Sequence, residues 1–134
     1  MLSNPRPRVL YVEDDADSRE MIGTLLKFSR IEAKAVATAA EAFQLMAGER
    51  FDLYLLGTSL PDLSGFELCR QMRASNPQTP ILFYSGAAYE SDKQRGIEAG
   101  ANCYVAKPDV DGLVGSIASL VFPGKGPCCQ GNRY

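Results

Sequence analysis

Histidine is absent from the 134 residues of this chain. Its absence excludes histidine as a general base, as a zinc ligand and as a phosphohistidine donor or relay. No stretch approaches the ~18 consecutive apolar residues of a membrane-spanning helix. The segment Met1–Arg8 is polar and contains proline, unlike a signal peptide. We therefore expect a soluble, cytoplasmic protein with no membrane partner.

Runs of like charge are also missing. The chain carries 14 Lys and Arg against 16 Asp and Glu, for a formal net charge of -2, and its basic residues form no run along the sequence. We expect no nucleic-acid partner, because binding to nucleic acid requires a basic patch. With 46% hydrophobic and 22% charged residues, the composition is typical of one folded domain, which at this length buries roughly two-thirds of its unfolded surface.

The four cysteines are too few and too scattered to indicate a disulfide framework. Cys69 falls in a helical pattern and Cys103 in an apolar strand, where a reduced cysteine acts as a small buried hydrophobe. Cys128 and Cys129 are adjacent in a glycine-rich end of the chain, for which the sequence gives no defined role.

Five short runs of residues predict β-strands. Four are nearly continuous in apolar residues, as in strands buried on both faces of a parallel sheet, and one alternates. They span residues 8–12, 32–37, 53–56, 81–84 and 103–106. Apolar residues at three-to-four-residue spacing predict helices between and after them. The alternation of strand and helix predicts an α/β domain with helices on both faces of a parallel sheet.

Two of the expected helices begin with capping-box signatures. In such a box, a hydroxyl and a carboxylate three residues later satisfy free backbone amides of the first turn. Thr38 and Glu41 form one pair, and Ser64 and Glu67 form the other. We therefore expect helices to begin directly after Thr38 and after Ser64.

The helix expected at residues 90–99 is the poorest of the set. It contains Gly96, which lowers helix propensity, and its single large apolar anchor is Ile97. We expect it to be the most mobile helix of the domain.

Side chains with useful chemistry follow the expected strands. The residues after the first, third, fourth and fifth strands are Glu13-Asp14-Asp15, Gly57, Ser85 and Lys107-Pro108, respectively. Ligands of open α/β sheets bind beyond the carboxyl ends of the strands. We therefore expect an acidic cluster, a hydroxyl and an ammonium group to meet on one rim, with a glycine among them.

Several separated motifs, taken in order, resemble the receiver domains of two-component response regulators. They are VLYVEDD, FDLYLLGTSLPDLSGFEL, ILFYSG and AGANCYVAKP, and the likeness covers about residues 8–122. The resemblance implies a flavodoxin-like, doubly wound sheet of five parallel strands in the order 2-1-3-4-5. It leaves residues 1–7 as an N-terminal segment and residues 123–134 as a C-terminal tail.

The resemblance implies a magnesium site on the rim. Glu13 and Asp14 match the acidic pair that holds the ion, and Ser59 matches the loop position whose backbone carbonyl also faces it. Magnesium commonly uses one or two protein carboxylates and keeps several waters. Because a third carboxylate is missing here, we expect binding to be weak or lost, and we expect no cofactor to be required.

The resemblance also implies a phosphoryl-responsive switch. Ser85 matches a hydroxyl that bonds the phosphoryl group, although the favoured interpretation of this residue is a satisfied hydroxyl at the end of a strand. Tyr104 matches the aromatic residue whose rotamer follows the switch, and it fits either a core position or a partner-facing one. Lys107 matches the lysine that pairs with phosphoryl oxygen, and Pro108 matches a proline usually preceded by a cis bond.

Gly57 departs from the family pattern. The resemblance places the phosphoryl-accepting aspartate four residues before the loop proline, Pro61, and glycine occupies that position. An acyl phosphate needs a carboxylate nucleophile, which glycine lacks. Asp52 lies roughly 16 Å away at ~3.3 Å per residue of strand, Asp62 lies beyond the proline, and Thr58 should point to the opposite side of the sheet. We therefore expect an atypical receiver, or pseudo-receiver.

Structural roles stay open for the charged residues of the rim. Asp15 or Asp17 is expected to cap the helix that follows the first strand. Lys107 is expected to form a salt bridge to Asp14 or Glu13, and without a phosphoryl group that pairing would be permanent.

Three functions follow from these observations. The leading one is a phosphorylation-independent signalling or adaptor module, not an enzyme, that acts through protein–protein interaction. Its partner is expected on the surface formed by residues 90–99, Tyr104 and residues 113–121, which a homodimer would also use. The alternatives are a sensor that binds a small ligand or anion in the vacated pocket, and a receiver phosphorylated at a non-standard acceptor.

Overall fold

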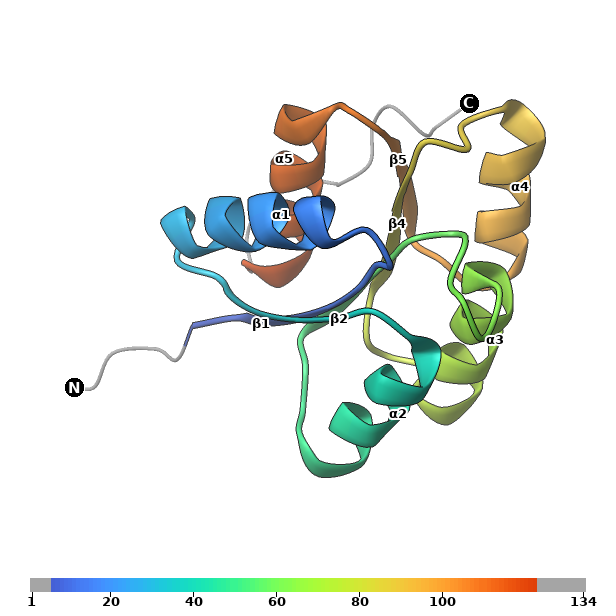
Figure 1. The fold of residues 1–134 in the computed structure, drawn as a ribbon, viewed down its shortest axis with the longest axis horizontal. Helices are drawn as coiled ribbons and strands as arrows, with labels where there is room; N and C mark the ends of the chain where they lie inside the picture. The colour runs from blue at the N-terminus through green and yellow to red at the C-terminus, as the bar shows by residue number, and fades with distance from the viewer. Residues whose placement is uncertain (1–5, 123–134) are drawn as a thin grey trace.

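The computed structural model describes residues 6–122, in which five strands alternate with five helices (Figure 1). In chain order they are β1 (Arg8–Val12), α1 (Ala16–Phe28), β2 (Glu32–Val36), α2 (Ala39–Gly48), β3 (Leu53–Leu56), α3 (Gly65–Ser75), β4 (Ile81–Ser85), α4 (Glu90–Glu98), β5 (Cys103–Ala106) and α5 (Val110–Val121). Every expected strand is present, with bounds that differ from the sequence prediction by at most one residue. The expected tail, with Cys128 and Cys129, lies outside the described residues.

The sheet has the order β2-β1-β3-β4-β5, and every pairing is parallel. This confirms the predicted flavodoxin-like topology. In Figure 1, α1 and α5 lie on one face of the sheet, and α2, α3 and α4 lie on the other. Two buried apolar clusters, one on each face, hold these layers together. The central strands β1, β3 and β4 are almost fully buried, whereas the edge strand β2 has only half-buried and exposed residues.

Three side chains cap helices as the sequence indicates. Asp15 accepts the Ser18 amide at the start of α1, and Thr38 accepts the Glu41 amide at the start of α2. Ser64 accepts two amides at the start of α3, but the reciprocal half of its capping box is absent. The carboxylate of Glu67 instead accepts hydrogen bonds from the side chains of Arg70 and Gln71. These residues are three and four positions further along α3, so they lie on the same face of the helix.

Of the two cysteines within residues 6–122, one follows the expectation. Cys69 is free and buried in α3, and burial raises the pKa of its thiol to about 11. Cys103 on β5 is disulfide-bonded, so the reduced state expected for it is wrong. Sequence spacing gives no information on which cysteines approach one another in space, and that approach decides pairing.

No helix within residues 6–122 is long and apolar enough to cross a membrane.

Asp62 ties the loop after β3 to the start of α2. Its two carboxylate oxygens accept the amides of Ala39 and Ala40 at 3.0 and 2.9 Å. These two hydrogen bonds hold the pKa of Asp62 below its ordinary value of 3.8, and the positive end of the helix dipole favours the same charged form. The carboxylate thus fixes the position of the loop that borders the rim.

We expect Asp62→Ala to lower the free energy of unfolding at neutral pH. Because the pKa is lower in the folded chain than in the unfolded one, the stabilisation is fully present above pH 3.8 and is lost as the pH falls through the folded-state pKa. Urea titrations of both proteins at several pH values measure the difference, which should shrink toward zero in acid. A difference that stays constant down to the lowest pH would contradict this electrostatic account.

Candidate functional site

A polar hollow of about 350 Å³ lies at the carboxyl ends of the strands, where the sequence places the rim. Residues 13–15 after β1, 57–59 after β3, 84–87 at the end of β4 and Lys107 after β5 line it. Gly57 itself is buried, and its amide donates to the carbonyl of Val12 at 2.9 Å. The structure therefore brings together the segments that sequence analysis assigned to the site.

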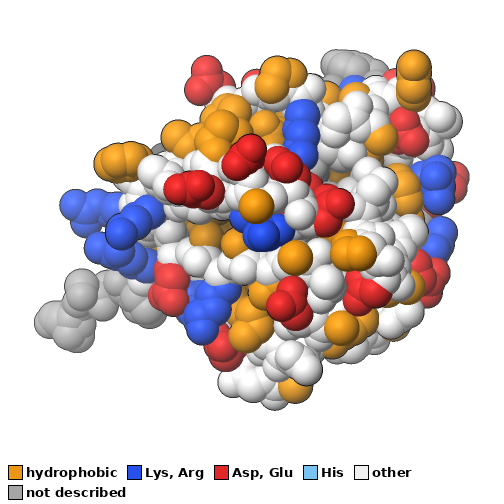
Figure 2. Space-filling model, viewed as in Figure 1, with side chains coloured by type: hydrophobic (Ala, Val, Ile, Leu, Met, Phe, Trp, Pro, Cys, Tyr) orange, Lys and Arg blue, Asp and Glu red, His pale blue; other side chains and the backbone are white. Residues whose placement is uncertain are grey.

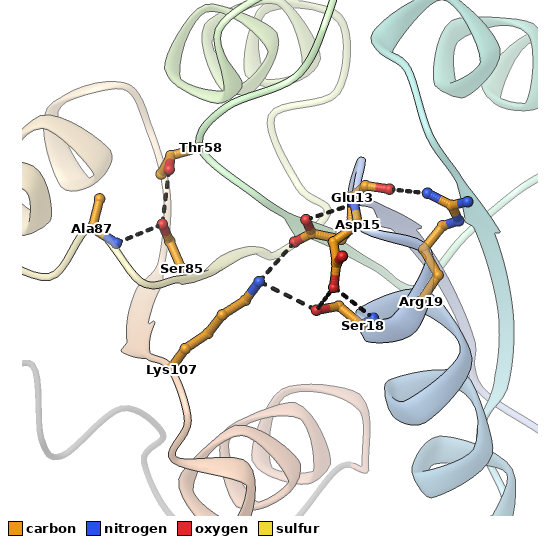
Figure 3. Close-up of polar contacts among 8 residues, drawn as sticks. All are labelled: Glu13, Asp15, Ser18, Arg19, Thr58, Ser85, Ala87 and Lys107. Carbon is orange, nitrogen blue, oxygen red and sulfur yellow. Dashed lines mark hydrogen bonds and ion pairs between the residues drawn. The ribbon is translucent and has the colours of Figure 1, made fainter.

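Glu13 is the buried charge of this hollow, with only 5% of its surface exposed. Its Oε1 accepts from the Lys107 ammonium at 3.2 Å, and its Oε2 accepts from the Asp15 amide at 3.1 Å (Figure 3). Burial raises the pKa of Glu13, and these two donors oppose the rise by favouring the carboxylate. The carboxylate is a fixed element of the site, with both oxygens engaged.

Lys107 pairs with Glu13 and not with Asp14, which settles the alternative that the sequence left open. Its Nζ also donates to the Ser18 hydroxyl at 3.4 Å and lies 5.7 Å from the centre of the Tyr84 ring. The bond between Lys107 and Pro108 is cis, as the resemblance implied. Lys107 thus reaches from β5 across the hollow to the end of β1.

Ser85 and Thr58 join their hydroxyls across the rim at 2.8 Å. Ser85 also accepts the amide of Ala87 at 3.0 Å, so the interpretation of a satisfied strand-end hydroxyl is confirmed (Figure 3). The expectation that Thr58 points away from the site is wrong. The alternation of side chains applies within a strand, and β3 ends at Leu56, so Thr58 already belongs to the turn.

Tyr104 is a core residue with 1% of its surface exposed. Its hydroxyl donates to the carbonyl of Ala87, and its ring stacks on Phe83 with the centroids 5.5 Å apart. Burial raises the pKa of its hydroxyl. Of the two positions that the sequence allowed, the structure places the ring inward, beneath α4.

Three residues of the site were missed by sequence analysis. Arg19 donates to the carbonyl of Glu13 at 2.7 Å, and Ser18 joins Asp15 to Lys107 from the first turn of α1. Tyr11 is fully buried, and its hydroxyl is the one buried side-chain oxygen or nitrogen within residues 6–122 that has no hydrogen-bond partner. Burial and the nearby charge of Glu13 raise the pKa of this hydroxyl. A position in a strand or a helix turn gives no sequence signal for these roles.

A magnesium ion does not fit the arrangement of these side chains. Glu13, Asp14 and Ser59, the residues implied as ligands, all border the hollow. However, within the described part of the chain no group of three His, Cys, Asp or Glu side chains could hold a metal ion. Both oxygens of Glu13 already have protein donors, and one of these donors is itself a cation. Magnesium requires near-octahedral oxygen ligation, to which Glu13 cannot contribute while its carboxylate is paired with the Lys107 ammonium.

The sequence matches a known protein family over most of its length. The family model of the response regulator receiver domain matches residues 9–118. The chain belongs to the response regulator receiver family. Within curated proteins, it is 38% identical over 120 residues to the cell cycle response regulator CtrA of Brucella ovis. The match covers 89% of this chain and 52% of CtrA, so the chain spans about half the length of that relative.

Solved receiver structures have the same architecture. A response regulator from Chloroflexus aurantiacus J-10-fl superposes with a TM-score of 0.82 at 30% identity, covering 87% of this chain and 98% of that one. The non-phosphorylated HemR receiver domain from Leptospira biflexa gives 0.80 at 28% identity, with 90% and 98% coverage. The BeF3-activated DrrB receiver domain gives 0.77 at 26% identity, with 84% and 94% coverage. These receivers support the five-stranded topology over the full described domain.

Proposed function

We propose that this receiver is a phosphorylation-independent signalling module that acts as an adaptor through protein–protein contact. The observation that carries the proposal is Gly57, which stands at the end of β3 where the receiver pattern requires a carboxylate nucleophile. Lys107, which would meet a phosphoryl oxygen, is paired with Glu13 instead. The rim of a phosphorylation switch is therefore present without its acceptor.

The other carboxylates near β3 serve structural roles. Asp52 accepts the backbone amide of Arg8 at 2.8 Å, at the opposite end of the strand from the hollow. Asp62 is held by the first turn of α2. Neither lines the hollow, which supports the view that no nearby aspartate substitutes for the missing acceptor.

The surface of α4, β5 and α5 is the proposed docking face. On or beside α4, Tyr89 is 80% exposed and Ile97 is 44% exposed, two of the large apolar side chains that the domain leaves in solvent. Ile97 is therefore not the anchor that the sequence predicted for this helix, because the buried residue of α4 is Gly96. Exposed apolar side chains of this size are suited to a protein interface, and a second copy of the chain would dock on the same face.

Two other functions have a specific observation behind them. The polar hollow offers the hydroxyls of Thr58 and Ser85 to a small ligand, although its three acidic residues disfavour an anion. The same Thr58 hydroxyl, placed inside the rim, is the best candidate for a non-standard acceptor. Both remain alternatives to the adaptor, and one experiment separates all three.

We expect the chain to give no response to magnesium and beryllofluoride, a phosphoryl mimic, and no covalent adduct with acetyl phosphate. Amide NMR spectra follow the first response, and intact-protein mass spectrometry follows the second. The matched variant Gly57→Asp restores a carboxylate and is expected to show shifts spreading from the hollow toward Tyr104 and α4. Shifts that appear in the unmodified protein on addition of beryllofluoride, beyond any caused by magnesium alone, would favour a ligand sensor, and an adduct on Thr58 would favour the non-standard acceptor. Either result would overturn the adaptor proposal.

A further inference from the structure

The carboxylate of Glu13 occupies the space that a side chain at position 57 would take. A β-carbon added to Gly57 would lie 2.9 Å from Glu13 Oε1 and 3.4 Å from its carboxyl carbon. Real β-carbons essentially never approach an oxygen that closely. A residue with a side chain at position 57 would therefore require the carboxylate end of the Glu13 side chain to shift from its observed position.

The Glu13 carboxylate is stabilised in the hollow by a cation and by a hydrogen-bond donor. A buried carboxylate is costly unless a cation and hydrogen-bond donors surround it. Lys107 supplies the cation to Oε1, and the Asp15 amide supplies a donor to Oε2. Arg19 holds the backbone carbonyl of Glu13 at 2.7 Å, so the side chain and the main chain are both fixed (Figure 3).

Acidic residues gather at this end of the domain. Asp14, Asp15 and Asp17 are exposed around the start of α1, and Figure 2 shows acidic side chains clustered over that helix. In such surroundings a cation at Glu13 is favoured on electrostatic grounds, and the Lys107 ammonium is already there. A divalent ion would have to displace it.

We propose that Glu13 and Lys107 form an internal ion pair over Gly57 that replaces both the acceptor carboxylate and the metal ion of a receiver site. Glu13 takes the place of the missing carboxylate, and Lys107 takes the place of the divalent cation. The pair closes the site to magnesium, and its carboxylate uses the room that residue 57 leaves by having no side chain. This inference rests on the proposed phosphorylation-independent function and gives the physical reason for it.

The first test removes the lysine. Magnesium titration, followed by the ¹³C resonance of the Glu13 carboxyl, should leave the unmodified protein unchanged. In Lys107→Met, magnesium should bind on the order of tenfold more tightly or better, because the buried carboxylate has lost its cation. Lys27→Met, at the exposed end of α1, is the matched control and should behave like the parent. A magnesium-dependent shift of Glu13 in the parent, or no gain in Lys107→Met, overturns the inference.

The second test probes position 57 and does not depend on Lys107→Met folding. Gly57→Ala should push Glu13 away from Lys107, which moves the Glu13 carboxyl resonance and speeds hydrogen exchange at the Lys107 ammonium. In a Glu13→Asp background the shorter side chain at position 13 should leave room for the alanine, so Gly57→Ala should then hardly change hydrogen exchange at the Lys107 ammonium. Gly86→Ala borders the same hollow with no atom within 4 Å of its added carbon, so it should change neither signal. An unperturbed Glu13 in Gly57→Ala contradicts the inference.

Magnesium binding and acetyl phosphate adduct formation distinguish a failure of the ion-pair inference from a failure of the adaptor proposal. If the parent binds magnesium through Glu13 yet forms no acetyl phosphate adduct, the ion-pair inference fails and the adaptor proposal stands. If the parent forms an adduct, the adaptor proposal fails whatever magnesium does.

Discussion

Gly65→Ala is expected to lower the free energy of unfolding by about 3 kcal/mol or more. A β-carbon on Gly65 would overlap the carbonyl oxygen of Gly57 and lie 2.8 Å from Thr58 Cα. Both are backbone atoms, so no side-chain rotation relieves the overlap. The Gly65 amide also donates to the carbonyl of Thr58 at 2.8 Å, which draws the start of α3 onto the turn that follows β3. The alanine must separate these two segments and thereby distort the hollow.

Gly23→Ala is the matched control for this substitution. Gly23 lies inside α1, and a β-carbon there would meet no atom within 4 Å. Alanine in a helix interior is favoured over glycine by roughly 0.5–1 kcal/mol, so the control should gain stability. Urea unfolding monitored by circular dichroism compares the two variants. Equal behaviour of the two alanines would show that α3 does not pack on the turn as described.

Gly96→Ala is expected to cost about 1–3 kcal/mol through overpacking, although alanine normally stabilises a helix. The added carbon would lie 2.8 Å from Tyr104 Cδ2 and 3.1 Å from Phe83 Cδ2. Since the two rings are stacked and buried, one of them must move. The expected result is a displaced Tyr104 ring and loss of its hydrogen bond to Ala87.

Gly115→Ala on α5 controls for helix propensity, because no atom lies within 4 Å of its added carbon. Urea titration gives the stability change of each variant, and the aromatic NMR resonances of Tyr104 report the position of the ring. Stabilisation of both variants by similar amounts, with an unmoved Tyr104, would refute the packing role assigned to Gly96.

The sheet and much of the site could be predicted from the sequence. The apolar runs of β1, β3 and β4 are typical of strands in a sheet that is covered on both faces. Parallel pairing of such strands brings their carboxyl ends to one rim. For that reason Glu13, Gly57 and Lys107 were expected to meet, and they do. The preference of Lys107 for Glu13 over Asp14 needed the structure, because it depends on which carboxylate points inward.

Other features depended on contacts between segments distant in sequence. Gly96 was interpreted as a weakness of α4, but its role is to admit the ring of Tyr104 from β5. Thr58 was assigned by strand alternation to the wrong side, because the end of β3 cannot be located to one residue from sequence. The disulfide of Cys103 follows from a spatial approach that spacing does not reveal.

A row of three rings lies on the face of the sheet that α3 and α4 cover. Phe66 at the start of α3 lies 5.2 Å from Phe83, which lies 5.5 Å from Tyr104, and the Arg95 guanidinium of α4 covers Phe66 at 4.1 Å. Close-packed rings transmit displacement with little slack. Coupling between two binding sites is reciprocal. If an occupant of the hollow changes the affinity for a partner that contacts α4, then that partner changes the affinity of the hollow for its occupant by the same factor. In this receiver, a partner bound at the proposed docking face would therefore act on the hollow, the reverse of the usual direction of signalling.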